Sequence, residues 1–216
     1  MREKLRFFLS DESKFGKAMQ RVWTLIAVNL LFLVFSFPVI TAGPAFCAMY
    51  YVLLKTLRSR YGDVYLLSDF WTGFKTCFKK GMIYWLIVLV IAVIAVMDIR
   101  FAMYMGGIMT IFKYAIYLIC GVVLLITFFM FPVMAAFEDS LPALIRNSLY
   151  FASKNPLRAL LIVFINVFPM VLTYMDLQRL PLYAFLWVAF GFAAIAMVVS
   201  NMLLKDFNQF LPDADY

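Results

Sequence analysis

Residues 22–54 read VWTLIAVNLLFLVFSFPVITAGPAFCAMYYVLL, a run without Lys, Arg, Asp or Glu that Phe37-Pro38 and Gly43-Pro44 interrupt near its middle. One helix of this length would measure about 50 Å, whereas the hydrocarbon core of a membrane is about 30 Å thick. Two complete spans of about 20 residues each do not fit either. We therefore expect a first helix over residues 22–38, a tight turn, and a shorter second helix that begins near Pro44, because proline is tolerated in the first turn of a helix.

The composition indicates an integral membrane protein. Apolar residues make up 66% of the 216 residues and charged residues only 14%, compared with about a quarter charged in soluble domains. No stretch is suited to a separate soluble domain, so we expect a single transmembrane domain over residues 1–216.

The predicted fold class is an all-α membrane protein, a helical bundle of about six transmembrane helices with additional amphipathic interfacial helices. Gly106-Gly107 separates the third span from the fourth, and a short turn around Asp176 separates the fifth from the sixth. Whether residues 44–57 cross completely or only dip into the membrane stays open, although the basic clusters on both sides favour crossing. The expected spans are residues 22–38, 44–57, 81–97, 114–137, 157–175 and 180–204.

The formal charge of +7 follows the expected topology. Basic residues cluster in residues 2–21, 55–60, 75–80 and 146–158, and these clusters alternate with apolar spans, as the positive-inside rule predicts for cytoplasmic segments. We therefore expect both termini in the cytoplasm, contact with membrane lipid, and no nucleic-acid partner. Residues 1–21 are predicted to form an amphipathic lead-in; a cleaved signal peptide is the competing interpretation, but no convincing cleavage site is present.

The residue types argue against common catalytic and metal chemistry. The chain has no histidine, which removes the usual general base and the commonest metal ligand. The chain has an odd number of cysteines, and they are far apart in the sequence, at Cys47, Cys77 and Cys120. The sequence therefore indicates neither a disulfide framework nor a zinc site. We expect all three to be buried as small apolar residues, and we predict no cofactor.

Two segments have the periodicity of amphipathic helices. In residues 69–80, aromatic residues recur on one helical face and lysines on another, and this helix is expected to continue into the third span. Residues 140–155 form the second amphipathic helix. Both are predicted to lie at the cytoplasmic face, where they attract anionic lipid or contact a neighbouring permease. The candidate interface residues are Phe70, Trp71, Phe74, Lys75, Phe78, Lys79, Lys80, Arg146 and Lys154.

Polar residues inside the spans are candidates for helix packing or partner binding. An amide at membrane depth needs a partner helix, backbone or water to satisfy it. Small residues beside the break in the first apolar run would allow helices to approach closely. Packing within one monomeric bundle is the alternative interpretation for each of them. These candidates are Asn29, Pro38, Thr41, Gly43, Pro44, Asn166 and Asn201.

Several motifs resemble those of a known family. The segments Asn29-Leu30-Leu31, Phe37-Pro38-Val39-Ile40-Thr41-Ala42-Gly43-Pro44-Ala45 and Tyr50-Tyr51 resemble the opening of the YesL-like family of bacterial membrane proteins. The segments Asp69-Phe70-Trp71-x-x-Phe74-Lys75-x-x-Phe78-Lys79 and Lys154-Asn155-Pro156 are similar to later landmarks of that family. Cys77 stands where a polar residue, often Asn, is expected. The resemblance implies a multi-pass protein of the bacterial cell membrane and supplies no catalytic or sugar-binding residue.

The expected function is that of a non-catalytic accessory subunit or assembly partner of a carbohydrate ABC importer, as the resemblance implies. An autonomous transporter or channel is the first alternative, but no span has an acidic residue at its centre. A membrane enzyme acting on lipid or glycan is the second. Its candidate acids would be Glu138 with Asp139, or Asp98 with Asp176, and adjacent carboxylates point to different sides of a helix.

Overall fold

The computed structural model describes residues 14–58, 65–105, 107 and 109–210. Within these ranges the chain is helical and contains no strand, and six segments are long and apolar enough to cross a membrane. The predicted all-α membrane fold is therefore confirmed. Most of the predicted lead-in, residues 1–13, and residues 211–216 lie outside the described residues. The elements are α2 (Lys14–Ser36), η1 (Val39–Thr41), α3 (Ala42–Arg58), α4 (Leu66–Met105), α5 (Met109–Ala136), α6 (Leu141–Lys154), α7 (Pro156–Met175), η2 (Leu177–Arg179), α8 (Leu180–Leu186), η3 (Trp187–Gly191) and α9 (Phe192–Phe207).

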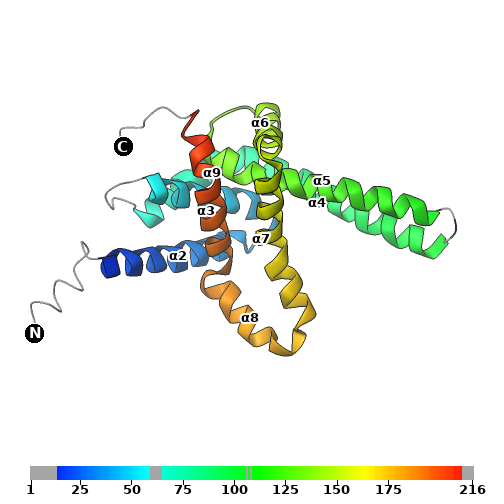
Figure 1. Cartoon of the computed structure of the whole chain (residues 1–216), viewed down its shortest axis with the longest axis horizontal. Coiled ribbons are helices and arrows are strands. Elements are labelled where there is room, and N and C mark those ends of the chain that lie inside the picture. Colours follow the sequence, from blue (N-terminus) through cyan, green and yellow to red (C-terminus); the bar gives the residue numbers. More distant parts are fainter. Residues whose placement is uncertain (1–13, 59–64, 106, 108, 211–216) are drawn as a thin grey trace, which may run out of the picture.

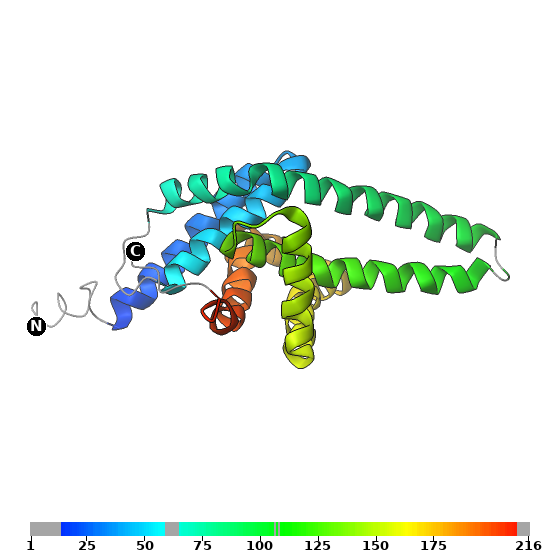
Figure 2. The ribbon, with the colours of Figure 1, turned by 90° about the horizontal axis from the view of Figure 1, so that it is seen from above.

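The helices form a central core from which two hairpins project (Figure 1). The α4–α5 hairpin extends to one side, and the α7–α8 hairpin leaves the core in a different direction. Figure 2 shows α4 running along the whole length of the molecule, with α2 and α3 beside its first part and only α5 beside its last part. The core is built around α3, whose apolar residues are almost all buried.

The break in the first apolar run is present where the sequence predicts it. Thr41 closes the turn between α2 and α3, because its backbone N–H donates to the Pro38 carbonyl at 2.8 Å and its hydroxyl donates to the Phe35 carbonyl at 2.7 Å. The second helix begins at Ala42, two residues before the predicted start at Pro44. Pro44 thus lies in the first turn, where a backbone N–H has no partner within the helix.

Close backbone contact joins α3 to the first half of α4. A Cβ atom on Gly43 would collide with the Gly81 carbonyl and would lie 2.6 Å from the Trp85 Cβ. A Cβ atom on Gly73 would lie 2.8 Å from the Tyr51 Cβ. Glycine at these positions therefore allows the two helices to approach closely.

The cysteines correct one expectation. Cys47 on α3 and Cys77 on α4 are joined by a disulfide with a Cα–Cα distance of 6.3 Å, whereas the sequence indicated isolated cysteines. Both are buried, as expected, at 0% and 2% exposure. Their separation of 30 residues is typical of no local motif, and only the antiparallel packing of α3 and α4 brings them together. Cys120 is the free cysteine of the described residues and is only partly buried, so the expectation that all three would be buried is wrong for it.

The predicted interfacial helix and the predicted third span form one helix, α4, of 40 residues. It ends at Met105, and Gly107, with a φ of 57°, lies in the turn to α5. Gly107 of the predicted break therefore lies in the hairpin turn, whereas Gly106 lies outside the described residues. The predicted sixth span contains an irregularity that the sequence did not reveal, because the π-helical turn η3 separates α8 from α9.

Substitution of Gly43 by Ala should destabilise the fold, since the added methyl group forces α3 away from Gly81. Overpacking of this kind costs about 1–3 kcal/mol. Gly121→Ala is the matched control, because a Cβ atom there meets nothing within 4 Å. Thermal unfolding in detergent, followed by loss of the monodisperse species, should show a lower midpoint for Gly43→Ala and an unchanged or higher one for Gly121→Ala. Equal midpoints would contradict the close contact.

The disulfide predicts the reactivity of the denatured chain. A polymer-linked maleimide added without reductant should shift the protein on a gel by one adduct, at Cys120. After reduction it should add three adducts, because Cys47 and Cys77 become available. Three adducts on unreduced protein that is denatured directly in the presence of the maleimide would show that the bond is absent.

Candidate functional site

Asn29 is the polar centre of the helix packing. Its side chain is 0% exposed, and its amide nitrogen donates to the carbonyls of Trp187 at 2.9 Å and Val188 at 2.8 Å. Its amide oxygen accepts a hydrogen bond from the Ala193 backbone N–H at 3.0 Å. One side chain of α2 thus satisfies three backbone groups of the sixth apolar segment.

The groups that Asn29 binds belong to the π-helical turn η3 and the start of α9. A π turn changes the hydrogen-bond pattern of a helix, and such turns often occur at functional sites. The Trp187 indole N–H also donates to the Thr173 hydroxyl at 3.0 Å, which joins the turn to α7. The turn is therefore held from two neighbouring helices, by Asn29 on one side and Thr173 on the other.

The other two predicted amides have different environments. Asn166 is buried, but its side-chain nitrogen donates to the Ile162 carbonyl of its own helix at 2.8 Å. Asn201 is exposed on α9. Of the three amides, only Asn29 therefore has a described bond between helices. Pro38 is exposed at the start of the α2–α3 turn, whereas Thr41, Gly43 and Pro44 lie progressively deeper in the hairpin.

The predicted cytoplasmic interface on α4 needs a correction. Phe70 and Phe74 are 1% and 7% exposed and pack against Phe35 of α2, so they belong to the interior. The surface of this part of α4 is made by residues at helical spacing that point outward. We call them the aromatic–basic strip: Trp71, Lys75, Phe78 and Lys79.

The aromatic–basic strip is ordered by contacts within α4. The Lys75 ammonium lies 5.0 Å from the centre of the Trp71 ring, a cation–π distance. Trp71 is 45% exposed and Phe78 is 38% exposed. Lys80, the remaining predicted residue of this segment, is half-buried at the edge of the strip. The strip therefore presents large aromatic surface and positive charge together.

A polar cluster gathers the ends of four helices, and we call this end of the molecule the basic face. Asp206 on α9 pairs with Lys154 at 3.1 Å and with Arg158, so it lies between two cations at the junction of α6 and α7. Lys154 also donates to Gln209 at 2.8 Å, and Arg58 of α3 donates to Asn208 at 3.1 Å. The predicted interface residue Lys154 is thus bound within the protein.

Sequence reasoning missed the role of Asp206. The predicted sixth span ends at residue 204 and leaves Asp206 out, although Asp206 is only 7% exposed. A weak signal was the apolar periodicity that continues to Phe207, which is fully buried. A second ion pair, between Lys55 and Asp69 at 2.6 Å, joins α3 to the start of α4 near the same face. Arg146, on α6, is exposed.

The acidic residues considered for catalysis are spread over the structure. Glu138 and Asp139 lie in the α5–α6 connection, where Asp139 accepts a hydrogen bond from Asn147 at 3.0 Å. Asp176 lies at the end of α7, 3.7 Å from Arg179, and Asp98 is exposed towards the end of α4. Among the described residues, no group of three His, Cys, Asp or Glu is placed to hold a metal ion.

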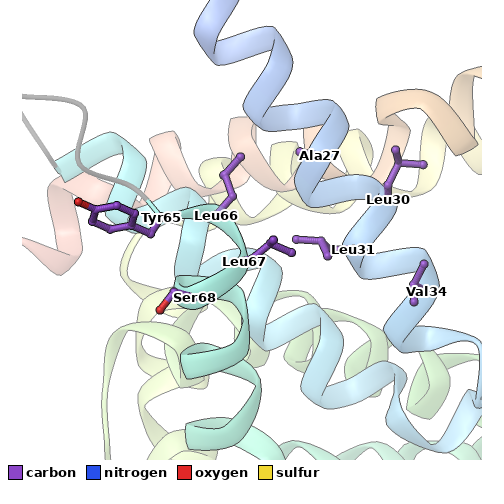
Figure 3. A pocket seen from close by; sticks show the side chains of 8 residues that line it. All are labelled: Ala27, Leu30, Leu31, Val34, Tyr65, Leu66, Leu67 and Ser68. Carbon is purple, nitrogen blue, oxygen red and sulfur yellow. The ribbon is translucent and has the colours of Figure 1, made fainter.

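An open apolar groove of about 780 Å³ runs between α2 and the start of α4 (Figure 3). Leu31 and Leu67 face each other across it, and Tyr65 and Ser68 are the polar residues of its lining. The groove offers apolar surface without a cluster of charged groups, so it has the character of a helix- or lipid-contacting surface.

These features define an α-helical protein with six helices suited to crossing a membrane, in which polar side chains join the helices. The profile of a family described as "Protein of unknown function, DUF624" matches residues 25–99. The matched segment contains Asn29, the Gly43–Gly81 contact and the aromatic–basic strip. No curated protein and no solved structure matches the chain.

Replacement of Asn29 by Ala should lower stability, because the Trp187 and Val188 carbonyls and the Ala193 N–H lose their partner. We expect a loss of about 2 kcal/mol, since each interhelical hydrogen bond in a membrane contributes roughly 0.6 kcal/mol and unsatisfied groups add a further cost. Asn201→Ala, at an exposed position, should stay within about 0.5 kcal/mol of the parent. Thermal unfolding in detergent measures both, and equal losses would contradict the role of Asn29.

Proposed function

We propose that the protein is a non-catalytic accessory subunit or assembly partner of a carbohydrate ABC importer in a bacterial cell membrane. Its task would be to bind the membrane-spanning permease subunits, and any effect on uptake of oligosaccharide would follow from that contact.

The aromatic–basic strip is the observation that supports a partner-binding role most directly. Aromatic residues are enriched at protein interfaces because they bury a large area at low cost in conformational entropy. Trp71 and Phe78 have this area available, and Lys75 and Lys79 add charge at the same helical face. Permease segments with acidic residues near the membrane surface would complement this strip.

The buried polar groups give a second argument for a non-catalytic role. Asn29 satisfies backbone groups, and Asp206 pairs with Lys154 and Arg158. These groups hold helices together, and their bonding capacity is directed at neighbouring elements of the same chain. The importer as partner rests on the resemblance of residues 29–51 and 69–79 to the YesL-like family.

Affinity purification from the native host in mild detergent tests the proposal. The tagged protein should recover permease subunits and a solute-binding protein in stoichiometric amounts. The double variant Lys75→Ala/Lys79→Ala should recover several-fold less permease, because it removes the charge of the strip without altering the interior. Lys205→Ala is the matched control, since it removes an exposed lysine of α9 outside the strip.

Two results would contradict this function. One is recovery of the protein alone under several mild conditions. The other is movement of solute by the purified protein in liposomes without any other component, which would favour an autonomous transporter. Unchanged oligosaccharide uptake in a strain that lacks the protein would separate a binding role from a role in transport.

A further inference from the structure

The contacts between α3 and α4 set the depth of the α2–α3 hairpin relative to α4. Gly43 lies against Gly81, Cys47 is bonded to Cys77, and the Trp85 indole N–H donates to the Val39 carbonyl at 2.7 Å. The tip of the hairpin is therefore level with residues 81–85 of α4. Beyond this level α4 continues to Met105 with only α5 beside it (Figure 2).

The length of α4 does not allow both of its halves to lie in the hydrocarbon core. Its 40 residues extend about 60 Å, twice the core thickness of about 30 Å. At the largest usual tilt, about 40°, the helix still extends about 45 Å along the membrane normal. About a third to a half of α4, together with the helices that pack beside it, must therefore lie outside the core.

Charge identifies the half that lies outside. Lys75, Lys79 and Lys80 occur in the first half, whereas residues 82–97 contain no charged residue. Charged side chains at the centre of a membrane are strongly unfavourable. The second half is also covered with exposed apolar side chains, and its only buried residues beyond Tyr84 are Ala95 and Ala102. The second half is therefore the segment that crosses.

We propose that the α2–α3 hairpin is re-entrant: it enters and leaves the membrane at the basic face, and its tip stays in the leaflet on that side. From Gly81 to Asp98, α4 extends about 25 Å, nearly the whole core, so the tip at the level of Gly81 lies close to the near boundary of the core. The proposal does not depend on the identity of any partner.

The surface of the hairpin fits this position. Phe37, Val39 and Ile40 at the tip are 88%, 62% and 52% exposed, so the tip offers apolar side chains to the acyl chains of the leaflet. The aromatic–basic strip on the adjoining part of α4 then lies at the membrane–water interface, the depth at which Trp and Lys side chains are favoured.

Site-directed cysteine labelling in sealed vesicles of both orientations tests the proposal. In a Cys120→Ala background that keeps the Cys47–Cys77 disulfide, Ile40→Cys and Phe37→Cys are treated with a membrane-impermeant sulfonated maleimide. Tyr104→Cys, 86% exposed near the end of α4, reports on the far face, and Tyr65→Cys, 73% exposed, reports on the near face.

We expect Tyr104→Cys and Tyr65→Cys to react in opposite vesicle orientations. The maleimide labelling of both tip variants should stay at background in the orientation in which Tyr104→Cys reacts. Both should be labelled fully after detergent is added, which shows that the membrane had shielded them. Reaction of either tip variant together with Tyr104→Cys would show that α2 and α3 cross, and would overturn the proposal. Reaction of Tyr65→Cys and Tyr104→Cys from the same face would overturn it as well.

Discussion

The backbone contact between Gly43 and Gly81 determines how the rest of the structure is arranged. It allows α3 to lie along the first half of α4, and the disulfide between Cys47 and Cys77 and the ion pair between Lys55 and Asp69 follow along the same pair of helices. Because α4 is one unbroken helix, this contact also fixes the direction in which the α4–α5 hairpin leaves the core. The depth of the α2–α3 hairpin along α4 is thus determined by the packing of α3 against α4 and not by the length of the hairpin.

The polar side chains of the interior occur where helices cross or end. Asn29 satisfies three backbone groups at the π turn, where an unpaired carbonyl in a lipid environment would be costly. Asp206, at the end of α9, joins the end of α6 through Lys154 and the start of α7 through Arg158. Such groups specify which helices meet, because apolar contacts in a membrane do not discriminate strongly among neighbours.

The sequence predicts those features that depend on local pattern. The apolar spans, the break between Pro38 and Gly43 and the turn at Gly107 follow from hydropathy and from the backbone preferences of proline and glycine. Periodicity in residues 69–80 places Phe70 and Phe74 on one side of a helix, but it does not show that this side faces a neighbouring helix instead of lipid. It also assigns Trp71 and Phe78 to a different face from Lys75 and Lys79, whereas all four are exposed together. The disulfide, the pairing of Asp206 and the π turn depend on residues that are distant in the sequence, so no local pattern could reveal them.

The π turn also affects the orientation of everything that follows it. One additional residue in a turn rotates the rest of a helix by about 100° relative to a regular α-helix. Ala193, Ala196 and Ser200 follow the turn and are buried, and Leu203 and Asp206 continue the same inward side. The π turn therefore affects which side of α9 faces inward, and with it the alignment of Asp206 with Lys154 and Arg158. Asn29 of α2 bonds to this turn, so a residue on a different helix contributes to that alignment.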